Sequence, residues 1–177
     1  MRMNEQTQTQ PLSRPWWFRV LLGRDPRRTL LRCLLWVLVA FFVFKYVLVP
    51  VRVQGISMQP AYQSGRVNFI NRWAYLAHPP RRGDVVGIQY AGRNVMLFKR
   101  IIALPGERIG IRRGIVYIDG KPLREPYVKL FNEHWERPEE PLAPDTYFVI
   151  GDNRAMSIRE HALGRAEADR IVGKALF

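Results

Sequence analysis

A single long apolar run constrains this 177-residue chain more than any other feature. Residues 29–50 are mostly Leu, Val, Phe and Trp, and they match the roughly 20 residues that an α-helix needs to cross a bilayer. Lys45 lies close enough to the exit end for its amine to reach water. The run is longer than the core of a secretory signal, and no small-x-small cleavage site follows it. We therefore predict a retained transmembrane anchor helix over 29–50.

Basic residues precede this anchor in excess over the two acids Glu5 and Asp25. The cations are Arg2, Arg14, Arg19, Arg24, Arg27 and Arg28, with Arg32 in the first turn of the predicted anchor. By the positive-inside rule, residues 1–28 form a basic cytoplasmic leader, and the remaining residues, 51–177, fold on the other side of the membrane. The net charge of +13 is dispersed, which suits an anionic phospholipid surface better than nucleic acid. We expect no nucleic-acid partner, because the sequence holds no pattern of a nucleic-acid-binding module.

Beyond the anchor, the sequence is typical of a mainly β, antiparallel domain over 51–177. Candidate strands cover 49–53, 66–70, 84–90, 95–103, 108–111, 115–118 and 147–150. Turn residues separate them without intervening helices, and Asp119-Gly120 is a strong hairpin signal. Residues 121–145 carry five prolines and no clean period, so we expect a Pro-rich excursion from the sheet.

The chemistry points to Ser57 and Lys99. A serine hydroxyl is a weak nucleophile without a neighbouring base, and a lysine serves as that base only where burial holds it neutral. Lys99 lies in the apolar run 95–103, and alternation along a strand sends Lys99 and Arg100 to opposite faces. One cation then lines a dry site while the other forms an ion pair. The alternative is that both are solvated charges on an edge strand.

Four blocks carry a family resemblance. They are Gly55-Ile56-Ser57-Met58-Gln59-Pro60, Arg82-Gly83-Asp84-Val85-Val86, Lys99-Arg100-Ile101-Ile102-Ala103-Leu104-Pro105-Gly106-Glu107 and Gly151-Asp152-Asn153-Arg154-Ala155-Met156-Ser157. In order and spacing they resemble the motif blocks of bacterial type I signal peptidases. The resemblance implies an antiparallel β fold and a membrane-bound serine endopeptidase. Such an enzyme removes signal peptides from exported preproteins at the outer face of the bacterial cytoplasmic membrane.

Carried over by residue, the resemblance makes Ser57 the nucleophile and Lys99 the general base. Ser157 orients the Lys99 amine, and the backbone N–H of Ser57 donates to the oxyanion. Arg100 pairs with Asp152 and supports Lys99 from behind. No metal or cofactor is implied. The expected partners are preprotein signal peptides, membrane phospholipid and the secretion machinery.

Some positions depart from the family pattern. The acidic residue, serine and arginine that usually follow Ser157 are replaced by Arg159-Glu160-His161, so the usual ion pair is absent from its place. Arg159 with Glu160, or Glu160 with His161, are the candidate substitutes. At the position where some members carry a second oxyanion donor, this chain has Gly55. The sequence therefore describes a divergent member of the family.

Two alternatives stay open beside a general signal peptidase. One is a dedicated maturation peptidase with a narrow substrate, such as a pilin, which the changes after Ser157 would suit. The other is a catalytically silent relative that binds signal peptides, although Ser57, Lys99 and Ser157 are all present. We also expect Met58, Trp73 and Tyr75 to form an apolar lip at the bilayer, with ordinary core packing as the alternative for Trp73.

Overall fold

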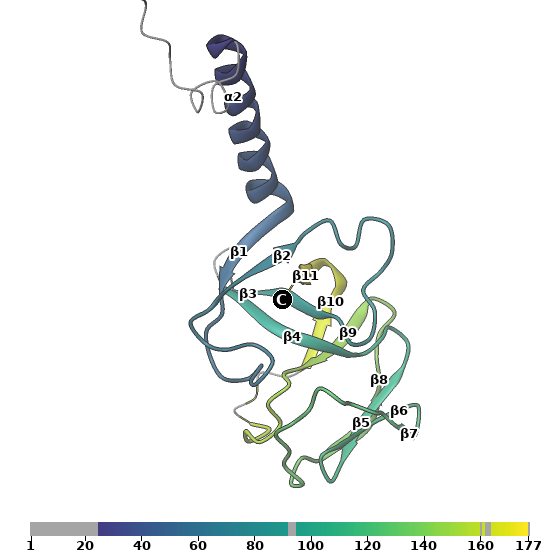
Figure 1. Cartoon of the computed structure of the whole chain (residues 1–177). Helices are drawn as coiled ribbons and strands as arrows, with labels where there is room; N and C mark the ends of the chain where they lie inside the picture. The colour runs from purple at the N-terminus through teal and green to yellow at the C-terminus, as the bar shows by residue number, and fades with distance from the viewer. Residues whose placement is uncertain (1–24, 92–94, 160, 162–163, 177) are drawn as a thin grey trace, which may run out of the picture. The chain divides into compact units, whose positions relative to one another are not determined.

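The computed structural model of the chain describes residues 25–91, 95–159, 161 and 164–176 (Figure 1). The chain divides into two compact units, the first ending at Phe42 and the second beginning at Val43. Most of the predicted leader, residues 1–24, lies outside the described residues.

The first unit contains the predicted apolar helix, α2 (Pro26–Phe42), and a π-helical turn, η1 (Val43–Val47), opens the second unit. The stretch Arg27–Val47 is long and apolar enough to span a bilayer, and its side chains are not buried by protein. Helical structure ends three residues before the predicted limit of 50, because Leu48 already begins strand β1. Pro50 explains this end: it lacks an N–H and disfavours helical dihedrals at the residue before it.

The second unit consists of two antiparallel sheets, which confirms the predicted mainly β fold. The larger sheet has the order β1-β2-β11-β3-β4-β9-β10. Its strands are β1 (Leu48–Arg52), β2 (Val67–Asn71), β3 (Val85–Ala91), β4 (Val95–Ala103), β9 (Thr146–Ile150), β10 (Gly164–Glu167) and β11 (Ile171–Ala175), with a 3-10 turn η2 (Ala168–Arg170) before β11. The smaller sheet has the order β7-β6-β5-β8, with β5 (Arg108–Arg112), β6 (Ile115–Ile118), β7 (Lys121–Pro122) and β8 (Arg137–Pro141).

Four strands were not predicted. Two of them, β7 and β8, lie inside the Pro-rich excursion, so that stretch forms part of a sheet and not only a departure from one. Both are edge strands of the smaller sheet. A proline is tolerated there because the backbone N–H that it lacks is not needed for pairing with a second neighbouring strand. The other two are β10 and β11. Strand β11 lies between β2 and β3, and Gly173 permits the close approach, because a Cβ there would be 2.3 Å from the Asn71 carbonyl oxygen.

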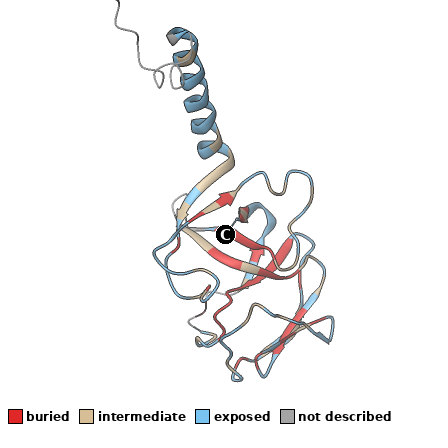
Figure 2. Ribbon diagram, viewed as in Figure 1, coloured by how far each residue is buried: buried red, intermediate tan, exposed pale blue. Residues whose placement is uncertain are grey.

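Strands of both sheets contain buried residues (Figure 2), and their side chains join the two sheets. One apolar cluster combines Ile102, Phe148 and Ile150 of the larger sheet with Ile109 and Ile111 of the smaller one. The smaller sheet is therefore packed against β4, which contains Lys99, and against β9, which ends just before the Gly151 block. A separate cluster lies at the other end of β4.

That second cluster corrects one expectation about the surface. Met58 packs there with Phe98 and is buried, so it is not part of an exposed apolar lip. Tyr75 is partly buried and donates to the Asp84 carboxylate. Only Trp73 of the three is exposed, with 56% of its surface accessible.

Candidate active site

Ser57 lies in the loop between β1 and β2. Burial of the neighbouring Met58 anchors this loop, and the turn closes through the Tyr62 N–H, which donates to the Met58 carbonyl at 2.9 Å. The Ser57 side chain is half-buried. Within the part of the chain that the structure describes, the Ser57 N–H has no acceptor. It is thus free to bind a developing oxyanion. Gly55 supplies no side-chain donor, and its N–H donates to Ser64 Oγ at 3.2 Å.

The loop is held from the other side by the turn that follows β9. The Asn153 N–H donates to the Ser57 carbonyl at 3.0 Å, and Asn153 Nδ2 donates to the Ile56 carbonyl at 3.1 Å. Gly151 allows this approach, since a Cβ at that position would be 2.1 Å from the Ser57 oxygen. Sequence reasoning gave Asn153 no function. Its place inside the fourth motif block was the available signal.

Lys99 lies in β4, between β3 and β9, so the edge-strand alternative does not hold. Its side chain is 2% exposed, and Phe98 beside it packs with Met58 beside Ser57. Among the described residues, the Lys99 amine has no hydrogen-bond or ion-pair partner within bonding distance. Burial lowers the pKa of Lys99 from 10.5 to about 8, against the opposing effect of the Asp152 charge.

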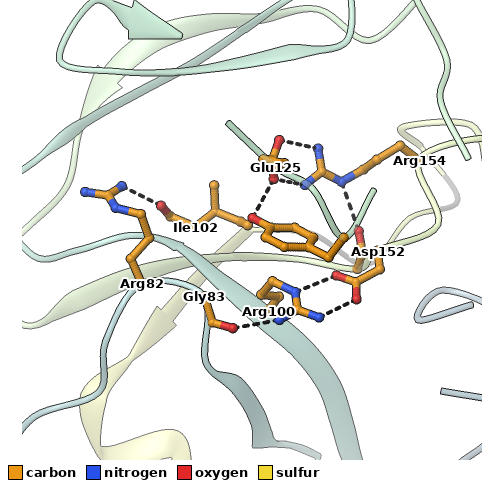
Figure 3. Close-up of polar contacts among 9 residues, drawn as sticks. Arg82, Gly83, Arg100, Ile102, Glu125, Asp152 and Arg154 are labelled. Carbon is orange, nitrogen blue, oxygen red and sulfur yellow. Dashed lines mark hydrogen bonds and ion pairs between the residues drawn. The ribbon is translucent and has the colours of Figure 1, made fainter. Parts of the chain in front are cut away.

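Arg100, the next residue in β4, forms an ion pair (Figure 3). Its Nε and Nη2 atoms donate to the two carboxylate oxygens of Asp152 at 2.8 and 2.6 Å, and Nη1 donates to the Gly83 carbonyl at 2.7 Å. The Asp152 side chain is fully buried. The two adjacent cations of β4 thus have different surroundings, because Arg100 takes the carboxylate and Lys99 has none in contact.

Among the described residues, no hydrogen bond joins Ser157 to Lys99. Ser157 is exposed, and its Oγ accepts a 3.4 Å hydrogen bond from the Arg159 N–H. The proposal that Ser157 orients the Lys99 amine therefore stays a prediction. The hydrogen bond between Ser157 and Arg159 does not support it.

His161 occupies the position where the resemblance leads one to expect an arginine. The ring is 3% exposed, packs edge-on against Trp135 with centroids 5.0 Å apart, and lies against Gly151. Burial, together with the charges of Lys99 and Arg154, lowers the pKa of His161 to about 3. A neutral imidazole with so low a pKa is a poor general base at neutral pH. Glu160, a member of both candidate substitute pairs, lies outside the described residues.

A buried ion pair that the sequence did not predict lies behind the same turn. Arg154 donates through Nη2 and Nη1 to the Glu125 carboxylate at 2.5 and 3.2 Å, and through Nε to the Gly151 carbonyl at 2.9 Å. Tyr127 also donates to Glu125, at 2.9 Å, and its ring lies 4.1 Å from the Arg100 guanidinium. Glu125 and Tyr127 come from the Pro-rich excursion, where nothing in the sequence pattern set them apart.

Together these groups are suited to acyl transfer. A half-buried hydroxyl on a fixed loop, an N–H without an acceptor and a buried amine with a lowered pKa are the parts that such chemistry requires.

The family model and the relatives that match this chain all belong to one family of proteins. The family model described as signal peptidase, peptidase S26, matches residues 27–177. The probable signal peptidase I-1 of Synechocystis is 32% identical over 96% of this chain and 87% of its own length. Signal peptidase I T of Bacillus subtilis is 32% identical over 80% and 78% of the two chains. A solved signal peptidase I from Enterococcus faecalis is 24% identical, with 54% of this chain and 95% of that chain covered and a TM-score of 0.43.

We predict that Lys99→Met stabilises the fold at neutral pH. Because burial lowers the pKa of Lys99 to about 8, an unfolded chain binds more protons between pH 8 and 10.5, and native stability rises with pH there. Below pH 8 the buried charge costs on the order of 3 kcal/mol. Urea unfolding of the full chain in detergent should show the variant more stable at pH 7, with the gain lost as the pH rises towards 10.5. The exposed Lys121→Met is the matched control, and equal stability of native chain and Lys99→Met at pH 7 would contradict the burial argument.

Proposed function

Because the chain belongs to the signal peptidase family, peptidase S26, it is a membrane-bound serine endopeptidase that cleaves signal peptides, and we propose that Ser57 is its nucleophile and Lys99 its general base. The observation that carries this assignment is the burial of Lys99 without a counter-ion in contact among the described residues. A lysine in such a setting loses its proton near neutral pH and can accept one from a serine.

The proposed reaction has two halves. Ser57 Oγ attacks the scissile carbonyl carbon while the neutral Lys99 amine takes the hydroxyl proton. The Ser57 N–H binds the oxyanion, and a second donor has to come from backbone or water, since Gly55 has no side chain. The peptide C–N bond then breaks as Lys99 returns the proton to the leaving amine. Water hydrolyses the resulting ester and regenerates Ser57.

We propose that the substrate binds as an extended segment with small residues, such as alanine, before the cut. Two features of the site support this. The nucleophile loop is packed on an apolar cluster around Met58, and main-chain groups of the loop and the turn lie close together. Main-chain hydrogen bonds then supply affinity, and shallow apolar pockets supply the preference for small side chains.

The family is membrane-anchored, and the described part of this chain has one helix, near the N-terminus, that is able to span a bilayer. We propose the finer arrangement from the charge pattern: a cytoplasmic N-terminus, and a catalytic domain on the outer face of the bacterial cytoplasmic membrane. Phospholipid and the secretion machinery are its proposed partners there. A dedicated maturation peptidase is the second candidate function, supported by the replacement of the family's usual residues after Ser157 by Arg159-Glu160-His161.

We expect the native chain to cut a synthetic preprotein with an Ala-x-Ala signal site. In detergent, Ser57→Ala and Lys99→Met should each lower kcat/KM by about 10³-fold or more, because each removes one partner of the nucleophile–base pair. The control Lys121→Met removes an exposed lysine and should cut at the native rate. Native activity retained by Ser57→Ala would refute the assignment. A native chain that cuts only one natural precursor would favour the dedicated peptidase.

The rate should rise with pH. The protonated Lys99 amine cannot accept the Ser57 proton, so kcat/KM should increase tenfold per pH unit at low pH and level off above a midpoint near pH 8. Initial rates with the same preprotein between pH 6 and 10 measure this profile. A flat profile over that range would remove Lys99 from the role of base.

Topology can be tested with single cysteines in a Cys33→Ser background, since Cys33 is the chain's one cysteine. Glu133→Cys lies at an exposed position of the catalytic domain, and Gln8→Cys lies in the leader. A membrane-impermeant maleimide should label the Glu133→Cys chain on intact spheroplasts and the Gln8→Cys chain only after lysis. The reverse pattern would place the catalytic domain in the cytoplasm.

A further inference from the structure

The buried ion pair between Glu125 and Arg154 has no function in the reaction described above. The Arg154 side chain is 2% exposed and the Glu125 side chain 9%, so both charges are nearly removed from water. Among the described residues, the carboxylate in contact with Arg154 is that of Glu125. A buried guanidinium that loses its carboxylate must change its position or draw in water. The position of Arg154 therefore depends on Glu125.

Arg154 in turn fixes the turn that holds the nucleophile. Its Nε donates to the Gly151 carbonyl at 2.9 Å, and its backbone N–H donates to the Leu130 carbonyl at 3.0 Å. Between these two anchored points lies Asn153, whose N–H and Nδ2 bind the Ser57 and Ile56 carbonyls. Displacement of Arg154 would thus be transmitted through two residues of main chain to the peptide unit of Ser57.

The Glu125 carboxylate is also connected, through Tyr127, to Arg100, the neighbour of Lys99 in β4. Glu125 accepts the Tyr127 hydroxyl at 2.9 Å, and the Tyr127 ring covers the guanidinium of Arg100, which is paired with Asp152 (Figure 3). One side chain from the excursion is therefore connected to both halves of the site. Of the described residues just after Ser157, Arg159 is a cation and His161 is neutral, so neither supplies an equivalent carboxylate.

We propose that Glu125 is a positioning residue of the peptidase, and that its carboxylate, acting through Arg154, sets the orientation of the Ser57 loop for attack. This inference rests on the proposed functions of Ser57 and Lys99. It differs from a merely structural function, in which the ion pair fastens the excursion and affects stability alone. A positioning residue lowers kcat in folded enzyme, whereas a fastening residue lowers the unfolding temperature without changing kcat.

The test uses the full chain in detergent, with the Ala-x-Ala preprotein, well below the unfolding temperature of every variant. Glu125→Gln keeps the shape and removes the charge, and kcat should fall on the order of 10- to 100-fold with KM changed less than about twofold. Glu125→Asp should recover part of the loss. Arg154→Gln should lower kcat similarly, and the double variant should be no worse than either single variant, because the two side chains act as one unit.

The matched control is Glu139→Gln, from the same excursion, whose carboxylate pairs with the exposed Arg108 and Arg112. It should keep native kcat. Native kcat in Glu125→Gln, with or without a lower unfolding temperature, would overturn the proposal, and so would an equal loss in Glu139→Gln. If Glu125→Gln does not fold, Glu125→Asp decides: reduced kcat in folded protein supports positioning, and native kcat overturns it. Ser57→Ala in the same assay distinguishes failure of this inference from failure of the proposed function. If the native chain cleaves the preprotein no faster than Ser57→Ala does, the proposed function itself is refuted.

Discussion

The site depends on one costly arrangement, a lysine amine buried without a counter-ion in contact. Strand β4 makes this possible because adjacent residues face opposite sides of a sheet. Arg100 takes the Asp152 carboxylate, and Lys99 is left buried with no carboxylate in contact among the described residues. The Asp152 charge still raises the pKa of Lys99, but burial outweighs it, and a direct ion pair would have stabilised the ammonium form further. The alternation of a single strand thus separates an ion-paired cation, Arg100, from the proposed base, Lys99.

The turn after β9 connects that strand to the Ser57 loop. The register places Arg100 opposite Ile150, so the residues that follow Ile150 start beside β4. The next three residues make different contacts, since Gly151 leaves room for the Ser57 carbonyl, Asp152 pairs with Arg100, and Asn153 binds the Ser57 loop. The apolar cluster shared by the two sheets keeps β4 and β9 together, and so keeps the turn in register with Lys99.

The sequence was informative where a local pattern decides structure. β-branched runs predicted seven strands of the structure, and the Asp119-Gly120 signal predicted the hairpin between β6 and β7. Sequence patterns did not predict the features that depend on contacts with residues distant in the sequence. Strand β8 contains Pro138 and Pro141, and only its position at the edge, next to β5, allows it to pair. Glu125 is likewise unremarkable in the sequence, because its contact with Arg154 joins residues 29 positions apart.

Beside the changes after Ser157, the chain has a buried ion pair whose carboxylate comes from another segment. A buried arginine needs a carboxylate partner, which can come from any segment that the fold brings within reach, and for Arg154 it is Glu125 from the excursion. A cation at position 161 would then lie close to both Lys99 and Arg154, whose charges already disfavour protonation of the imidazole. A neutral, buried His161 avoids that repulsion and still fills the space between Trp135 and Gly151. The Glu125–Arg154 ion pair and the neutral His161 thus both limit the uncompensated positive charge around Lys99.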